Sequence, residues 1–171
     1  MHKLIKLIVY AEDENYAVKK ANSILENMCS SGRTYDWFSL FDEESKNTTA
    51  GIGRWGEFPR VTFANSKIGK ELIDEGWNAT KEEMKEALMK LREKIKNMKN
   101  TDIEKFIKTS YDVELNNLAY KVSDYDAVAY LYDNDGEAIR DEEHLNNALN
   151  KWNDSRYVNL KVYVVPADIH Y

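Results

Sequence analysis

The sequence of 171 residues contains little of several residue types, and each scarcity excludes a class of protein. Its single cysteine, Cys29, excludes a disulfide framework and any zinc site built from several cysteines. One free thiol suits a reducing cytoplasm, where we expect the protein to reside. No apolar run approaches 18 residues, so we expect no membrane-spanning helix. The two prolines, beside many asparagines, disfavour a hyperthermophilic source.

A basic excess is also missing from the chain. Lysine and arginine total 24 against 30 acidic residues, which gives a net charge of −6. Proteins that bind nucleic acids or membrane surfaces in general carry the opposite balance, so neither is an expected partner. The run Lys90, Arg92, Lys94, Lys96 and Lys99 reads instead as cations near a helix C-terminus that complement the helix dipole.

What is present describes a globular chain of mixed structure. Hydrophobic residues make up 43% of the sequence, aromatic residues 12% and charged residues 32%, a composition that argues against disorder. A chain of this length buries about two-thirds of the surface that its unfolded form exposes. We therefore expect one domain over residues 1–171.

The first part of that domain, residues 1–65, predicts a β-α-β unit followed by a glycine-rich hairpin. Residues 4–10 are rich in Ile, Leu and Val and predict a buried strand, not a signal peptide. Acidic residues at positions 12–14 predict the start of a helix, because acids suit the positive end of the helix dipole. Ser31-Gly32 predicts its end. Residues 34–41 then alternate as a second strand.

Residues 66–123 predict a helical insertion of three helices. The first covers residues 66–77. The second begins at the capping box Thr80-Lys81-Glu82-Glu83, and the third at a similar box over residues 101–104. Each helix has one apolar stripe and one charged face, so we expect the helices to pack on each other or on the sheet.

Residues 124–171 predict a second β-α-β unit. A strand over residues 126–132 leads to the turn at residues 133–136 and to a helix capped by Asp141. The last strand, residues 158–165, is expected to stop at Pro166. Two such units around a helical block predict an α+β fold, namely a split β-α-β (ferredoxin-like) sheet with a helical insertion between its halves. The apolar tail predicts a docked chain end, with Asp168 and His170 near a site.

The only glycine-dense stretch, residues 51–59, offers the clearest candidate for a contact site. Its spacing matches a dinucleotide-binding fingerprint, but Pro59 and an extended segment follow where a helix is required, and the other kinase signatures are missing. Three interpretations stay open: a hairpin with Trp55 in the core, a phosphate-binding loop, and a loop that contacts a ligand or partner. We favour the last, with these contact residues: Gly53, Arg54, Trp55, Gly56, Glu57 and Arg60.

Other motifs compete with ordinary turns and caps. Asp133, Asp135, Gly136 and Glu142 match part of a calcium-binding loop, yet Leu131 occupies its first ligand position, so a turn is favoured. A metal-dependent nuclease would gather the acids of two strand ends. These are Glu12, Asp13, Glu14, Asp126, Asp133 and Asp135, but Ala11 stands where the first acid is required.

No catalytic constellation remains once these motifs are weighed. The three histidines are not at ligand spacing, and a triad of serine, histidine and aspartate has no nucleophile-elbow context. Cys29 follows a helix C-terminus, whose negative end raises a thiol pKa and makes it a poor nucleophile. We therefore predict no catalytic residue, no metal and no cofactor.

Three stretches resemble an uncharacterised protein family found in archaea and their viruses. They are Gly53-Arg54-Trp55-Gly56-Glu57, Leu131-Tyr132-Asp133-Asn134-Asp135-Gly136 and Val164-Val165-Pro166-Ala167-Asp168-Ile169-His170-Tyr171. The resemblance carries over no functional residue and implies only a cytoplasmic, non-secreted protein. The lysine and asparagine content departs from the style of halophilic relatives.

Together these observations favour a non-catalytic binding or regulatory accessory protein. Its expected contact surface is the loop from Gly51 to Arg60 with the inserted helices, its expected partner is a protein, and sheet edges allow a homodimer. The alternatives are a small-molecule or nucleotide-handling enzyme that uses the same loop, and a metal-dependent nuclease.

Overall fold

The computed structural model describes residues 1–30, 35–109, 112–123 and 128–170. They form two compact units, the first made of residues 1–77 and 129–171 and the second of residues 78–128. The mixed α and β character predicted from the sequence is confirmed. The single-domain organisation, with its divisions at 1–65, 66–123 and 124–171, stays a prediction.

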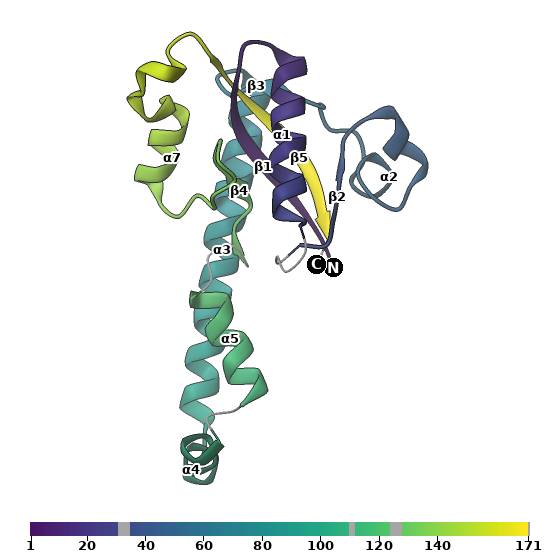
Figure 1. Ribbon diagram of the computed structural model, residues 1–171. Coiled ribbons are helices and arrows are strands. Elements are labelled where there is room, and N and C mark those ends of the chain that lie inside the picture. Colours follow the sequence, from purple (N-terminus) through teal and green to yellow (C-terminus); the bar gives the residue numbers. More distant parts are fainter. Residues whose placement is uncertain (31–34, 110–111, 124–127, 171) are drawn as a thin grey trace. The chain divides into compact units, whose positions relative to one another are not determined.

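The first unit is built around an open mixed sheet (Figure 1). Its strands are β1 (His2–Ala11), β2 (Trp37–Leu40), β3 (Thr62–Phe63), β4 (Leu131–Tyr132) and β5 (Lys161–His170). Its helical segments are α1 (Glu14–Met28), η1 (Glu43–Asn47), α2 (Ile52–Trp55), the first turns of α3 (Lys67–Asn97), α7 (Glu142–Leu149), η2 (Lys151–Asn153) and η3 (Ser155–Tyr157).

The strand order is β2-β5-β1-β4, and β3 pairs with β5 further along the same edge as β2. β5 runs antiparallel to both β1 and β2, so β1, α1 and β2 form one split β-α-β unit around β5. β4 runs parallel to β1 on its other side. A ferredoxin-like second half needs two parallel strands, whereas β4 and β5 run in opposite directions. The ferredoxin-like arrangement is therefore not confirmed.

β5 ends at His170, five residues after residue 165, where the last strand was predicted to end, because Pro166 does not stop it. Pro166 is paired with Lys6 of β1, and the Lys6 amide donates to Tyr130 O on the β4 side at 2.9 Å. In such a pair the backbone groups of the two residues point away from each other. The proline nitrogen thus faces the interval between the β2 and β3 pairings, where no ladder bond is lost.

Local turn and cap chemistry is confirmed at three predicted places. Asp13 caps α1 by accepting from the Tyr16 amide at 2.9 Å. Asp141 caps α7 by accepting from the His144 amide at 2.7 Å. The turn after β4 closes through Asp133, whose Oδ1 accepts from the amides of Asp135 and Glu137. By contrast, β4 is only two residues long, and residues 126 and 127 of the predicted strand lie outside the described residues.

Both faces of the sheet are covered within the first unit. α1 buries Ala17, Val18, Ala21, Ile24 and Leu25, and it lies across β1 and β5 in Figure 1. The opposite face forms a core cluster with Leu72 and Ile73 of α3 and Ala148 of α7, which meet Ile8 and Val164 of the sheet. β1 is buried along nearly its whole length, which is typical of a central strand.

The second unit is helical and contains the rest of α3 with α4 (Asn100–Thr109) and α5 (Val113–Ser123). Lys94 of α3 is 2.6 Å from Glu114 and 3.4 Å from Asp112, which joins α3 to the start of α5. The helix expected to begin at Thr80 is part of α3, where Thr80 is buried in a mid-helix position. The third predicted helix is divided into α4 and α5, and Asp112 caps α5 through the Leu115 amide at 2.8 Å.

Candidate functional site

The loop predicted from the sequence, residues 51–60, is attached to the end of the sheet by a buried carboxylate. Asp168 of β5 has no exposed surface, and its Oδ2 accepts a hydrogen bond from the Gly51 amide at 3.0 Å. Nδ1 of His2, on β1, lies 3.0 Å from Asp168 Oδ1. The predicted docking of the apolar segment that follows Pro166 is confirmed, because this segment is part of β5 and its Asp168 anchors the loop.

Glycines give this loop its shape. Gly51 has a φ of 49°, in the left-handed region that side chains disfavour. A Cβ on Gly53 would lie 1.9 Å from the Thr48 carbonyl oxygen, so only glycine fits there. Arg54 Nε donates to the Thr49 carbonyl at 2.8 Å and ties the loop to the segment before it. Gly53 thus helps to set the shape of the loop, and its predicted role in contact stays a prediction.

Every backbone amide from Gly51 to Gly56 already donates inside the chain. Ile52 donates to Ser45 Oγ at 3.1 Å and Gly53 to the Ala50 carbonyl at 3.1 Å. The next three amides close the turn of α2 on carbonyls of Gly51 and Ile52. A phosphate-cradling loop needs such amides to point at the ligand. The geometry of residues 51–56 therefore argues against a phosphate-binding role.

The predicted contact side chains are on the surface. Arg54, Trp55, Glu57 and Arg60 are all exposed, and Trp55 keeps 38% of its surface accessible. Trp55 is therefore not a plug in the core, which excludes the hairpin interpretation that required it there. Tryptophan and arginine are among the residue types most enriched at binding hot spots.

A hollow of about 600 Å³ lies beside the loop. Phe41, Ile52 and Phe58 line it with apolar surface, and the rings of Phe41 and Phe58 meet with centroids 5.1 Å apart. Its charged lining consists of Asp42, Glu43, Glu44, Lys46, Glu57 and Arg60. Two predicted site residues, Glu57 and Arg60, thus share one concave surface with η1.

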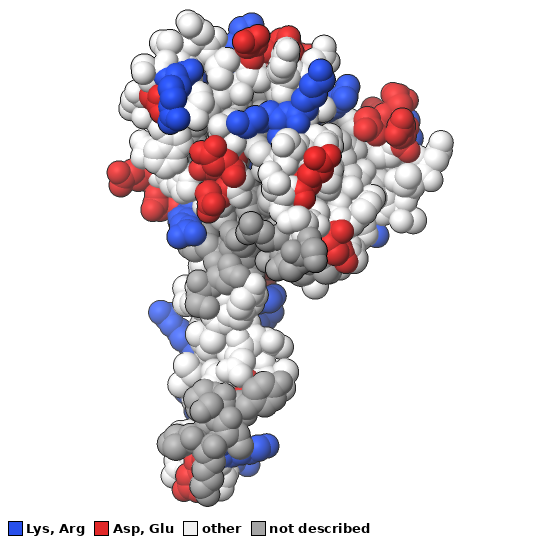
Figure 2. Space-filling view, in the orientation of Figure 1, with Lys and Arg blue, Asp and Glu red and all other residues white. Residues whose placement is uncertain are grey.

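Acids dominate this edge of the first unit. Figure 2 shows Asp and Glu side chains gathered where Figure 1 labels α2. Lys46 is bound to Glu43 at 2.8 Å, and this hydrogen bond raises the Lys46 pKa above its ordinary value. Because Lys46 is already paired with Glu43, the concave surface favours cationic groups of a partner.

Two histidine–carboxylate pairs were not predicted from the sequence. Nε2 of His144 lies 3.1 Å from Asp133 Oδ2, and Nδ1 of His170 lies 2.7 Å from Asp36 Oδ1. The hydrogen bond to His170 lowers the pKa of Asp36. The partners are distant in sequence or on separate elements, so spacing along the chain gave no signal. For the third pair, His2 with Asp168, the sequence did carry a signal. The alternation of side chains along paired strands places His2, Asp168 and His170 on one face.

Two of the carboxylates proposed for metal chemistry, Asp133 and Asp13, are engaged in local structure. Asp133 is buried and bonded to two turn amides and to His144, and Asp13 caps α1. Asp126 lies outside the described residues. Within the part of the chain that the structure describes, no three His, Cys, Asp or Glu side chains are placed to hold a metal ion. This geometry does not support a calcium loop or a nuclease centre.

Cys29 is a poor nucleophile, as predicted, but for a different main reason. Partial burial raises the pKa of its thiol to about 11, and the charge of Asp36 adds to the rise. The main cause is thus desolvation, with no need of the helix dipole. At neutral pH the thiol stays protonated, and thiolate is the reactive form.

Two of the five cations in the basic run of the second unit are paired with acids. Lys90 pairs with Glu86, and Lys94 with Glu114 and Asp112. Lys94 and Lys96 lie in the last turn of α3, where cations complement the helix dipole, as predicted. Among the described helices, none has both the length and the apolar character required to cross a membrane.

Comparison with known proteins gives one match. A family model described as "Domain of unknown function (DUF7995)" matches residues 1–171. A search of curated proteins and a search of solved structures returned no match.

Proposed function

The chain belongs to this family of unknown function, so we propose from the geometry that it is a non-catalytic binding module. Its contact surface is the loop of residues 51–60 together with the adjoining hollow. The partner is a protein that presents cationic and apolar groups. Through such binding the chain acts as an accessory protein that regulates its partner.

The observation that carries the proposal is the rigid presentation of exposed Trp55 and Arg54. The loop is held by the Gly51–Asp168 bond and by the Arg54–Thr49 bond, so its backbone is positioned before a partner arrives. Preorganised surfaces lose less conformational entropy on binding than flexible ones. Apolar floor and charged rim together match the anatomy of protein interfaces.

The test is affinity capture from the host with the full chain as bait, quantified by mass spectrometry. The double variant Arg54→Ala/Trp55→Ala should reduce the captured partner at least tenfold, because truncation at hot spots typically costs more than 1 kcal/mol each. The matched control is Tyr16→Ala/Lys19→Ala, which removes an exposed aromatic and an exposed basic side chain from α1, outside the expected contact surface. This control should capture the partner as the unaltered chain does.

Thermal unfolding of each variant separates binding from folding. The loop variant is expected to keep a melting temperature close to that of the unaltered chain, since both side chains are exposed. Equal capture by the loop variant and the unaltered chain would refute the proposal. A large loss of stability with unchanged capture would make the loop purely structural.

The enzyme alternative differs in what accompanies the purified protein. Native mass spectrometry without chelators should give the bare mass of a monomer or dimer. An extra mass of a few hundred daltons, or of metal ions, would favour the small-molecule enzyme. A homodimer, a cytoplasmic location and an archaeal or viral source stay predictions, and the same spectrum tests the first of them.

A further inference from the structure

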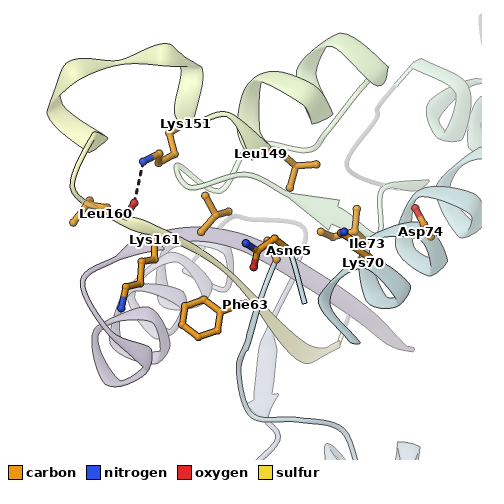
Figure 3. Close-up of a pocket in the computed structure, with 11 residues that line it drawn as sticks. Phe63, Asn65, Lys70, Ile73, Asp74, Leu149, Lys151, Leu160 and Lys161 are labelled. Atoms are coloured by element: carbon orange, nitrogen blue, oxygen red, sulfur yellow. Dashed lines mark hydrogen bonds between the residues drawn. The ribbon is translucent and has the colours of Figure 1, made fainter. Parts of the chain in front are cut away.

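A second hollow, of about 790 Å³, lies in the first unit away from the 51–60 loop (Figure 3). It is bounded by the first turns of α3, the end of α7 and the β3–β5 edge of the sheet. None of the six predicted site residues lines it. Its volume falls within the range of small-molecule sites, roughly 300–1,000 Å³.

The floor of this hollow is continuous with the core. Ile73 is a buried member of the core cluster, and Leu149, Leu160 and Val162 pack against that cluster while remaining partly exposed. Figure 3 shows Leu149 and Ile73 facing the space above β5 from two different helices. Partly exposed apolar side chains in a concave surface favour an apolar ligand, because its binding removes them from water.

Cations outnumber acids around the hollow, although the whole chain carries a charge of −6. Lys70, Lys151 and Lys161 line it against Asp74 alone. Among the ion pairs of the described residues, neither Lys70 nor Lys161 takes part. Lys161 Nζ lies 5.6 Å from the centre of the Phe63 ring, which also lines the hollow. Two exposed lysines that carry no ion pair beside an apolar hollow attract an anionic group.

The wall formed by η2 is held in an unusual conformation. Lys151, Trp152 and Asn153 have φ values of 56°, 53° and 52°, in the left-handed region that L residues other than glycine rarely adopt. Lys151 Nζ donates to the carbonyls of Val158 at 3.1 Å and Leu160 at 2.9 Å, which closes this wall over the start of β5. The second of these bonds is drawn in Figure 3. The hollow is thus shaped by specific hydrogen bonds within the chain.

We propose that this hollow binds a small organic anion with a flat or branched apolar body, such as an aromatic carboxylate or a phosphate ester. The apolar body lies on Ile73, Leu149 and Val162. The anionic group meets Lys70 and Lys161 at the mouth, and the Asn65 amide, which Figure 3 shows beside the hollow, supplies a further polar contact. This site is separate from the loop of the proposed function and stands without it.

The probe is 2-naphthoate, with the neutral 2-naphthylmethanol as its uncharged counterpart. Titration of the isotope-labelled full chain, followed by amide NMR shifts, should give saturable changes at Ala64, Asn65, Lys70, Leu149 and Val162. The naphthoate should bind at least threefold more tightly than the alcohol. Its affinity should fall as salt rises from 50 to 500 mM, because salt screens exposed charges.

The variant Lys70→Gln/Lys161→Gln should weaken naphthoate binding about fivefold, the scale expected when two exposed charges are removed. Its matched control, Lys67→Gln/Lys96→Gln, lowers the net charge equally at exposed lysines outside the hollow and should bind as the unaltered chain does. Equal weakening in both variants, equal binding of acid and alcohol, or shifts located elsewhere would each overturn the proposal. All four lysines are exposed, so neither variant is expected to affect folding.

Discussion

At the scale of single residues, Asp168 connects the core to the candidate surface. Its carboxylate is wholly buried on β5, yet it has two partners, His2 and the Gly51 amide. A buried carboxylate without partners is costly, so both contacts are required for folding as well as for the position of the loop. The candidate site and the stability of the sheet therefore depend on one side chain.

Asp168→Asn tests this dependence. The asparagine side chain keeps the size of the aspartate but removes the negative charge, whose hydrogen-bond partners are His2 and the Gly51 amide. We therefore expect a loss of about 2–3 kcal/mol in the free energy of unfolding. Denaturant titration measures it. Asp154→Asn is the control, since Asp154 bonds to the exposed Arg156 near the surface, and its effect should be much smaller. Similar losses in the two variants would contradict the central role of Asp168.

At the scale of elements, α3 shows where local signals are insufficient. The capping box at Thr80 is a valid start signal, but nothing before it stops the helix that already began at residue 67. Gly76 does not break the helix; a Cβ there would lie 2.7 Å from Leu131 Cδ2, so glycine permits close packing against β4. The capping box at Thr80 is a genuine local signal, but the packing around it keeps α3 continuous through this position.

A proline placed directly after each candidate N-cap, Ser66 or Thr80, shows at which of them a helix begins. Proline is tolerated at the first position of a helix and costs about 3 kcal/mol inside one. Lys67→Pro, directly after Ser66, whose Oγ accepts from the Gly69 amide, should therefore leave the free energy of unfolding nearly unchanged. Lys81→Pro should lower it by about 3 kcal/mol. If both variants were equally stable in urea, α3 would be two helices, as the sequence pattern first indicated.

The same reasoning separates what could be predicted from what could not. The caps at Asp13 and Asp141 and the turn at Asp133 depend on neighbours within a few residues, and each was predictable from local chemistry. The passage of β5 through Pro166 depends on which strands flank it, and the Gly51–Asp168 bond joins residues 117 positions apart. A single sequence without structure carries no direct signal for either. The loop was identified from composition, whereas its anchor required the fold.

At the scale of the whole molecule, the two units differ in how much they bury. The first contains the sheet and nearly all buried side chains, whereas only Thr80, Ala87 and Val128 are buried among the described residues of the second. Burial of apolar surface is the main source of stability. The second unit is therefore the less stable one.

Hydrogen exchange measures this difference within one helix. Amides of α3 in the first unit, at Leu72 and Ile73, should exchange at least about 100-fold more slowly than amides near Glu93, because local opening is easiest where few contacts are buried. β1 and β5 should set the upper limit of protection, since they form the central pair of the sheet. Uniform protection along α3 would show that the two units unfold as one.

The pairing of β1 with β5 also has a kinetic consequence. His2 meets Asp168 across 166 positions of sequence, so the central pair of the sheet joins strands from opposite ends of the chain. Contacts of such high separation close a long loop before they gain any stabilisation, which slows folding. During synthesis β1 leaves the ribosome first and has to wait for β5. The helices in between, which rely on local contacts, are free to form while the strand that anchors the loop is still to come.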